Sequence, residues 1–255
     1  MKNEIVPTLL SDTIIGIDVG IKDLAICSNG LKFININKSK KVKRISKRLK
    51  HYERKSSRKY RINKQCNAHI KTQNIIKAER KVASLHRRLK YIRNNHLHDA
   101  TSTIVRTKPC RVVMETLNIS GMMKNKHLSK AIAEQCLYEF KNILRYKCLI
   151  NGIEFVEADM WFPSSKMCSC CGNIKKDLKL SDRIYKCEHC GLIIDRDINA
   201  SINLSNYIAV QSPEKITANI TTPCMENQAC GVLYQTRVAS AKVDTKKQEL
   251  NKLSI

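Results

Sequence analysis

The chain has 255 residues, of which 47 are Lys or Arg and 22 are Asp or Glu, so its formal net charge is +25. This length gives one substantial core with room for smaller modules, and the excess of cations predicts a polyanionic partner, nucleic acid rather than a membrane surface because aromatic anchors are few. No segment reaches the ~18 apolar residues of a membrane-spanning helix and the N-terminus lacks a signal-peptide pattern, so we expect a cytoplasmic protein.

Strand-like runs occupy the N-terminal part of the chain. Residues 14–19 (IIGIDV) are apolar except for one carboxylate, Asp18. The runs DLAICS and LKFINI follow closely and are also typical of strands. Together the three runs predict a β-meander with Asp18 in its first strand.

A strongly basic segment comes next. Between Lys38 and Lys64 there are fourteen Lys or Arg residues and a single acid, Glu53. A solvated surface is the ordinary explanation for such a segment, but this imbalance favours contact with backbone phosphates, which positions a nucleic acid without reading its sequence. The candidate nucleic-acid contacts are Lys43, Arg44, Lys47, Arg48, Lys50, Arg54, Lys55 and Arg58.

Apolar residues recur in this segment at alternating steps of three and four, and the same rhythm returns downstream. Two helices with one narrow apolar seam each are therefore predicted, paired as an antiparallel hairpin within residues 37–104. We expect the chain to turn around Ser56 and Ser57. The seam residues are Val42, Ile45, Leu49 and Tyr52 in the first helix and Ile75, Ala78, Val82, Leu85, Leu89 and Ile92 in the second.

Two strands and two helices are predicted after the hairpin. CRVVME forms a buried strand ending at Glu115, TLNISGMM follows as a loop, and IEFVEA forms a further strand. Between the strands lies a helix whose apolar face is Leu128, Ile132, Cys136, Phe140 and Ile143. A last helix begins in DRDINASINL, with Asp197 as its N-cap and Ile198 and Ile202 on one face. The polar residues 211–255 are predicted to be disordered.

The most specific pattern is a set of four cysteines. Cys168 and Cys171 are separated by two residues, as are Cys187 and Cys190, and fifteen residues lie between the pairs. Each pair precedes a glycine, and two such turns can surround one Zn²⁺ with four thiolates at ~2.3 Å, leaving no position for water. The spacing predicts a structural zinc ribbon over residues 166–192 that unfolds without its ion.

Other cysteines leave alternatives open. Cys170 and His189 lie within the two turns and are substitute ligands by spacing, and four unrelated reduced cysteines are the ordinary alternative to a zinc site. Five scattered cysteines are interpreted as small buried hydrophobic residues. They are Cys27, Cys66, Cys110, Cys136 and Cys148.

Three carboxylates carry the candidate chemistry. Asp18 and Glu115 belong to predicted buried strands, where an isolated charge is costly, and Asp197 lies at a helix start. The cost falls if the acids converge on Mg²⁺ or Mn²⁺, and two such ions ~4 Å apart can drive phosphodiester hydrolysis. Each acid also has an ordinary explanation, since Asp18 can cap a turn, Glu115 can pair with a lysine, and Asp197 can cap its helix. Asp195 competes with Asp197 for the third position.

Five segments together resemble one family. GIDVGIKDLA around Asp18, VVMETLNISGM around Glu115, FPSSKMCSCCG, CEHCG and DRDINASINL resemble, in order, the signature segments of TnpB, the transposon-associated RNA-guided nuclease related to compact type V CRISPR effectors. The resemblance runs from residue 5 to residue 208. It implies that Asp18, Glu115 and Asp197 are the catalytic acids, and it selects Asp197 over Asp195.

The resemblance implies an α/β fold, an RNase H-like (RuvC) mixed sheet flanked by helices and formed by residues 1–36, 105–165 and 193–210. The basic helical hairpin and the zinc ribbon are insertions in it. The implied function is a transposon-encoded DNA endonuclease, often labelled transposase, with structural Zn²⁺, catalytic Mg²⁺, DNA as substrate and a guide RNA in intact relatives. It is expected to cut DNA and not to join strands.

Family members carry wedge and recognition domains before the first catalytic strand. Seventeen residues precede Asp18 here, so the resemblance implies a chain without those domains. A second hypothesis is a non-catalytic protein whose ribbon and hairpin bind DNA or RNA, although the presence of all three acids favours the nuclease. A Holliday-junction resolvase shares the chemistry but gives no reason for the ribbon.

Overall fold

The computed structural model describes residues 10–65, 71–179 and 182–207. The predicted disordered tail and Cys66 lie outside these residues. No helix in the described ranges is long and apolar enough to cross a membrane.

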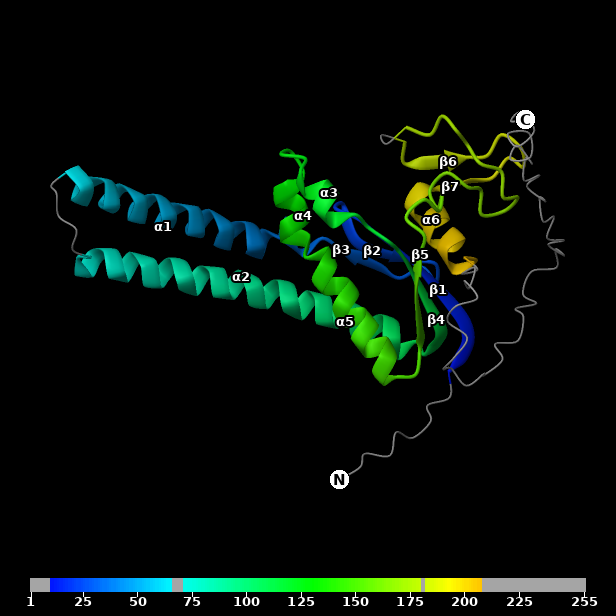
Figure 1. The fold of residues 1–255 in the computed structure, drawn as a ribbon, viewed down its shortest axis with the longest axis horizontal. Coiled ribbons are helices and arrows are strands. Elements are labelled where there is room, and N and C mark those ends of the chain that lie inside the picture. Colours follow the sequence, from blue (N-terminus) through cyan, green and yellow to red (C-terminus); the bar gives the residue numbers. More distant parts are fainter. Residues whose placement is uncertain (1–9, 66–70, 180–181, 208–255) are drawn as a thin grey trace, which may run out of the picture. The chain divides into compact units, whose positions relative to one another are not determined.

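A five-stranded mixed sheet forms the centre of the described chain (Figure 1). Its strands are β1 (Ser11–Val19), β2 (Asp23–Cys27), β3 (Lys32–Ile34), β4 (Pro109–Glu115) and β5 (Glu154–Ala158). The order across the sheet is β3-β2-β1-β4-β5. Strands β1, β2 and β3 are antiparallel neighbours and form the predicted meander, whereas β4 and β5 run parallel to β1. The predicted α/β class with a mixed sheet is confirmed.

The helices are α1 (Lys40–Gln65), α2 (Gln73–Arg106), α3 (Ile119–Met123), α4 (Ser129–Gln135), α5 (Leu137–Ile150) and α6 (Arg196–Ser205), with a 3-10 turn at Ile36–Lys38. Helices α2 and α5 cover one face of the sheet and α6 the other, whereas α1 packs on α2. Because side chains alternate along a strand, Ile17 and Met114 pack on one face against α2 and α5, while Val113 packs on the other face against Leu204 of α6. The main core therefore lies between the sheet and the α2–α5 layer.

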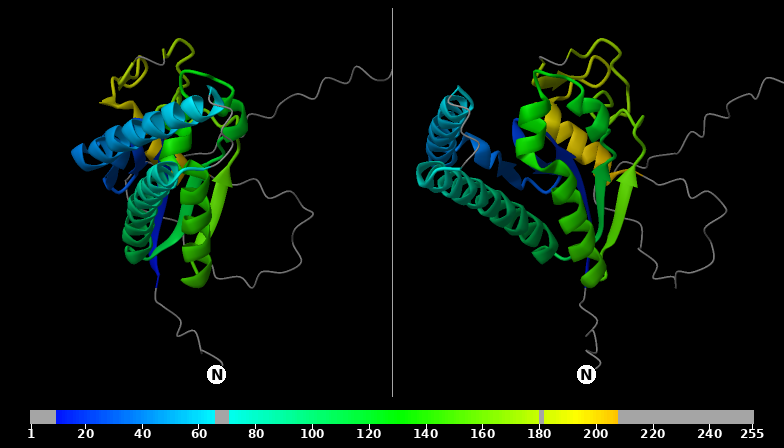
Figure 2. Two further views of the ribbon diagram at one scale, coloured as in Figure 1. Left: turned by 90° about the vertical axis from the view of Figure 1, so that its left-hand side faces the viewer. Right: turned by 60° about the vertical axis from the view of Figure 1, so that its left-hand side comes forward.

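Helices α1 and α2 form the predicted antiparallel hairpin, side by side in Figures 1 and 2. The predicted seam residues Val42, Ile45, Leu49, Leu85 and Leu89 are buried together between the helices. The predicted turn at Ser56 and Ser57 is wrong, because α1 continues to Gln65. Serine costs a helix interior only about 0.5 kcal/mol, and the surrounding Lys and Arg favour helix.

The C-terminal part of α2 belongs to the main core. Leu97, Ala100 and Ile104 are buried against the sheet and α5. Lys147 of α5 donates to the side chain of Thr101 at 2.8 Å and to the carbonyl of His98 at 2.7 Å. A single helix thus joins the basic hairpin to the core without a break.

Two details differ from the sequence prediction. The segment expected as a loop after β4 contains the short helix α3, whose first turn is capped by the Asn118 side chain accepting from the backbone N–H of Gly121 at 2.9 Å. The helix expected over residues 128–143 is two helices, α4 and α5. They separate at Cys136, whose φ of 56° places it in the left-handed region and interrupts the helical hydrogen bonds. Apolar periodicity continues across this break, which is why it was not predicted.

Candidate active site and metal centre

The first two candidate acids lie on neighbouring parallel strands. Ile17 of β1 is opposite Met114 of β4, and the next residue in each strand is a carboxylate, Asp18 and Glu115. Ile17 and Met114 face the α2–α5 core. Asp18 and Glu115 therefore share the opposite face of the sheet, on strands about 4.8 Å apart.

Gly16 shows which element covers that face. It precedes Asp18 by two residues and so shares its face. A Cβ atom on Gly16 would lie 2.0 Å from the carbonyl oxygen of Ser201 and 2.3 Å from the amide nitrogen of Ser205. The backbone of α6 thus rests directly on β1, and the first turn of this helix carries Asp197.

This close approach predicts a large cost for any side chain at Gly16. The variant Gly16→Ala is expected to lose about 3 kcal/mol of unfolding free energy, because helix backbone and not a flexible side chain must move. Gly20→Ala is the matched control, since its Cβ would meet the carbonyl oxygen of Asp23 at an ordinary 3.5 Å, and it should change stability by about 0.5 kcal/mol or less. Urea denaturation measures both. Equal stability of the two variants would contradict the packing of α6 on β1.

The three acids repel one another electrostatically. Burial raises the pKa of Asp18 well above its usual value, and the charges of Glu115 and Asp197 raise it further. The pKa of Glu115 rises to about 7 because burial outweighs a hydrogen bond from the backbone N–H of Val19, and Asp197 adds to the rise. Within the described ranges no Lys or Arg forms an ion pair with Asp18 or Glu115. A divalent cation would relieve this repulsion.

The acids are spread more widely than the ligands of one small ion. Among the described residues, the four cysteines are a group of potential ligands whose donor atoms all lie within 4.8 Å of one another, and the three acids do not meet that limit. One Mg²⁺ with oxygens at about 2.1 Å cannot contact all three acids in this arrangement. Two ions about 4 Å apart span a wider group of ligands.

Asp195 and Asp197 have different tasks at the start of α6. The side chain of Asp195 accepts from the backbone N–H groups of Asp197 at 2.9 Å and Ile198 at 3.3 Å, so Asp195 is the N-cap and the prediction of Asp197 as the cap is wrong. Asp197, in the first turn, forms ion pairs with Arg196 at 3.4 Å and Arg183 at 3.8 Å. It also raises the pKa of Asp18 more than Asp195 does. Capping thus occupies Asp195, whereas the charge of Asp197 acts more strongly on Asp18.

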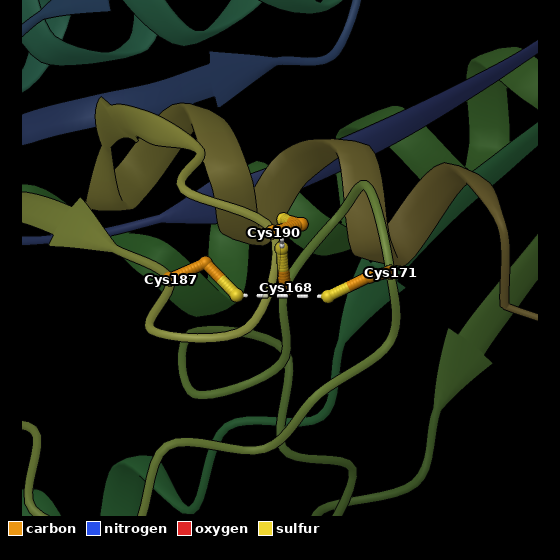
Figure 3. A group of neighbouring side chains, drawn as sticks. All are labelled: Cys168, Cys171, Cys187 and Cys190. Carbon is orange, nitrogen blue, oxygen red and sulfur yellow. Dashed lines mark hydrogen bonds between the residues drawn. The ribbon is translucent and has the colours of Figure 1, made fainter.

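The four cysteines of the predicted ribbon converge at one point (Figure 3). The Sγ atoms of Cys168 and Cys190 are 3.5 Å apart, and those of Cys171 and Cys187 are also 3.5 Å apart. A tetrahedral zinc ion with Zn–S distances of about 2.3 Å requires sulfur atoms about 3.8 Å from one another. The donor set and its spacing therefore fit Zn²⁺ with little movement.

Both turns of this cysteine module are built in the same way. The N–H of Cys168 donates to the carbonyl of Asn173, and the N–H of Cys187 donates to the carbonyl of Leu192, each at 2.9 Å. Gly172 and Gly191 follow the second cysteine of each pair with φ of 73° and 75°, a conformation that favours glycine. A hydrogen bond from the backbone N–H of Cys190 lowers the pKa of Cys187 to about 6. Burial raises the pKa of Cys168. A backbone hydrogen bond from Asn173 lowers the pKa of Cys171, but burial and the neighbouring thiols outweigh it and raise this pKa to about 12. Of these three thiols, only Cys187 favours the thiolate form that binds metal.

The remaining cysteines of the described residues divide into three groups. Cys170 is exposed and lies outside the four-thiol group, and so does the exposed His189. Cys27 and Cys148 are buried in the main core, as predicted. Cys110 and Cys136 are only half-buried, so the prediction of burial is wrong for them.

Comparison with known proteins shows which families and proteins this chain resembles. The family described as "Probable transposase" matches residues 2–126, and "Cas12f1-like, TNB domain" matches residues 138–204. A "Putative RNA-guided DNA endonuclease" of Streptomyces pristinaespiralis is 36% identical over 203 residues, which is 80% of this chain and 47% of the relative. "TnpB-like protein L79" of Acanthamoeba polyphaga mimivirus is 32% identical over 100 residues, 37% of this chain and 19% of that protein. The chain is a relative of these RNA-guided DNA endonucleases and TnpB-like proteins.

Two further comparisons describe the extent of this similarity. The chain spans about half the length of these curated relatives, 47% of the Streptomyces protein and 50% of InsQ of Escherichia coli K12, to which it is 28% identical. A solved CRISPR-Cas12f ternary complex contains a chain with the same fold, at a TM-score of 0.52 and 23% identity, covering 79% of this chain and 40% of that one.

Two asparagines attach the cysteine module to α6, the helix of the third candidate acid. Asn199 of α6 donates to the carbonyl of Met167 at 2.7 Å and accepts from the backbone N–H of Ser169 at 3.0 Å. Asn203 donates to the carbonyls of Ser164 at 2.7 Å and Met167 at 2.6 Å. Both asparagines are fully or almost fully buried. Sequence analysis missed them, because polar residues in DRDINASINL gave no sign of burial.

The eight cations proposed as nucleic-acid contacts all lie exposed on α1. Lys50, Arg54 and Arg58 line one surface pocket together with Arg61. Glu53, the single acid of this segment, lines the same pocket and lies 3.3 Å from His86 of α2, so four cations and one acid meet there. The exposed side of α1 thus presents positive charge to solvent along its length.

Proposed function

We propose that this chain is a divalent-metal-dependent DNA endonuclease with an RNase H-like (RuvC) core. The observation that carries the proposal is the face shared by Asp18 and Glu115, on parallel strands, beneath the helix start that carries Asp197. The names of its relatives support the nuclease class. The order β3-β2-β1-β4-β5, part antiparallel and part parallel, supports the RNase H-like architecture.

Asp18, Glu115 and Asp197 would hold Mg²⁺ or Mn²⁺. When bound, such ions activate a water molecule for attack on phosphorus and stabilise the leaving 3′ oxygen. The chain itself orients the ligands. Val19 donates its backbone N–H to the carboxylate of Glu115, and Arg196 pairs with Asp197 in the first turn of α6. These contacts limit the freedom of two of the three carboxylates before any ion arrives.

The cysteine module would hold one structural Zn²⁺. Four thiols fill a tetrahedral shell, which leaves no position for water, so the zinc takes no part in hydrolysis. Its proposed role is to keep the module folded. The buried asparagines of α6 then keep the backbone carbonyls that they bind.

DNA is the proposed substrate, with a guide RNA as second nucleic-acid partner. The solved structure with this fold is a CRISPR-Cas12f ternary complex, and the curated relatives are named RNA-guided DNA endonucleases. The exposed cations of α1 are the proposed phosphate contacts. Each neutralised phosphate should contribute about −0.9 to the slope of log affinity against log salt on duplex DNA.

The proposal is tested with zinc-loaded protein and end-labelled DNA, single-stranded and duplex. Internal cleavage is expected with Mg²⁺ or Mn²⁺ and not with Ca²⁺ or without added metal, because Ca²⁺ takes longer, more flexible ligand distances. A gel-shift assay on the same samples measures binding. Tight binding with no cleavage under any metal, with or without guide RNA, would identify a non-catalytic nucleic-acid-binding protein.

A further inference from the structure

The turn after β5 exposes the single tryptophan of the chain. Trp161 is 83% exposed, the largest exposed fraction among the large hydrophobic side chains of the described residues, and its neighbour Met160 is 47% exposed. An indole ring exposed to water does not gain the large favourable free energy of burying its apolar surface. A ring in this position is therefore available for a partner.

The backbone under this ring is held firmly. The N–H of Trp161 donates to the carboxylate of Asp159 at 2.7 Å, and the N–H of Asp159 donates to the hydroxyl of Tyr207 at 3.2 Å. The ring of Phe162 meets that of Tyr207 edge to face, with centroids 4.9 Å apart. The turn is thus anchored while the indole ring stays exposed.

The turn lies beside the acid cluster. Ala158, the last residue of β5, pairs with Glu115, and Thr116 donates to the carbonyl of Ala158 at 2.7 Å. Trp161 follows three residues later. Three extended residues and one strand spacing place its Cα within about 15 Å of the Cα of Glu115. Ser164, further along, is fixed to α6 by Asn203.

We infer that Trp161 is a stacking platform for an unpaired base of the DNA strand that the acids are proposed to cut. The inference rests on the proposed function and adds a contact for the substrate. A flat aromatic ring accepts any base by stacking, and Lys166, exposed five residues later, offers charge for the adjoining phosphates. The net charge of +25 favours a polyanion over an apolar protein surface as the occupant.

The experiment uses Trp161 as its own probe. Zinc-loaded protein without Mg²⁺ is titrated with an unstructured single-stranded DNA, with the same sequence as duplex, and with its RNA counterpart, while tryptophan fluorescence and anisotropy of the labelled oligonucleotide are recorded. Single-stranded DNA is expected to quench the fluorescence more than duplex does. Trp161→Ala should weaken single-strand binding about fivefold to about a hundredfold, and Trp161→Phe much less. Tyr146→Ala is the matched control, since Tyr146 is 64% exposed on α5, and it should bind as the unmodified chain does.

The outcomes separate this inference from the proposed function. Metal-dependent cleavage with unchanged single-strand affinity in Trp161→Ala would overturn the platform and leave the nuclease standing. Quenching and weakened binding without any cleavage would support the platform and count against the nuclease. Equal effects on single-stranded and duplex DNA, or effects confined to RNA, would also overturn the inference.

Discussion

Asp18→Asn is expected to lower the rate of DNA cleavage about a thousandfold or more, because it removes a charged ligand from the proposed metal cluster. Glu115→Gln and Asp197→Asn should cost about as much. Since the three acids act as one unit, the double variant Asp18→Asn/Glu115→Gln should be hardly slower than either single variant. Cleavage rates at saturating Mg²⁺ measure all four variants.

Two controls keep this prediction specific. Asp195→Asn should keep near-normal activity, because Asn caps a helix as well as Asp does and Asp195 is engaged in capping. Asp99→Asn replaces an exposed acid of α2 and should have no effect. A loss of cleavage in Asp195→Asn with full activity in Asp197→Asn would show that Asp195, and not Asp197, is the third catalytic acid.

Stability should move in the opposite direction to activity in these variants. The raised pKa of Asp18 means that its ionised form is unfavourable in the folded chain without metal. A neutral amide removes that cost, so metal-free Asp18→Asn should unfold at a higher temperature than the unmodified chain at pH 8. The pKa of Glu115 rises to about 7, so its ionised form destabilises the folded chain increasingly as the pH goes from the usual pKa of a glutamate up through 7. Thermal melting at pH 5 and pH 8 should show a larger gain for Glu115→Gln at pH 8.

Removal of zinc is expected to unfold the cysteine module and to abolish cleavage with it. Structural zinc contributes about 10 kcal/mol or more to small modules of this kind, and the buried cluster of this module centres on one tyrosine, Tyr185, beside the cysteines. Once the module unfolds, Asn199 and Asn203 of α6 lose the carbonyls that they bind. The helix that carries Asp197 then loses part of its support.

The matched variants are Cys168→Ser/Cys187→Ser and Cys170→Ser. The first should lose the bound zinc, become sensitive to protease within residues 166–192, and lose cleavage. The second should keep one zinc per chain, because Cys170 is exposed and outside the four-thiol group. Zinc content by mass spectrometry and limited proteolysis are the measurements. A protease-resistant, active Cys168→Ser/Cys187→Ser chain would show that the module does not depend on zinc.

Local patterns in the sequence predicted much of this structure. The seam of the basic hairpin was predictable because steps of three and four mark one face of a helix, and Val42, Ile45 and Leu49 are buried as that pattern requires. The cysteine spacing predicted which four thiols would meet. The runs around Asp18 and Glu115 predicted strands, since apolar runs of that length fit a buried sheet.

Features that depend on contacts between distant residues were not predictable. The break at Cys136 leaves the apolar periodicity intact. Gln135, just before it, is buried and donates a hydrogen bond to the carbonyl of Gly20, a residue distant in the sequence. The inward position of Asn199 depends on carbonyls of the cysteine module that no local pattern reveals. Which aspartate caps α6 likewise followed from where the helix begins, and helix ends are uncertain by one or two residues in any sequence pattern.

Anomalous diffraction from crystals of zinc-loaded protein soaked in Mn²⁺ tests the shared metal site most directly. The account predicts manganese peaks bordered by Asp18, Glu115 and Asp197, and a separate zinc peak among the four cysteines that serves as an internal control. Crystals that show the zinc peak but no manganese beside the three acids would contradict it.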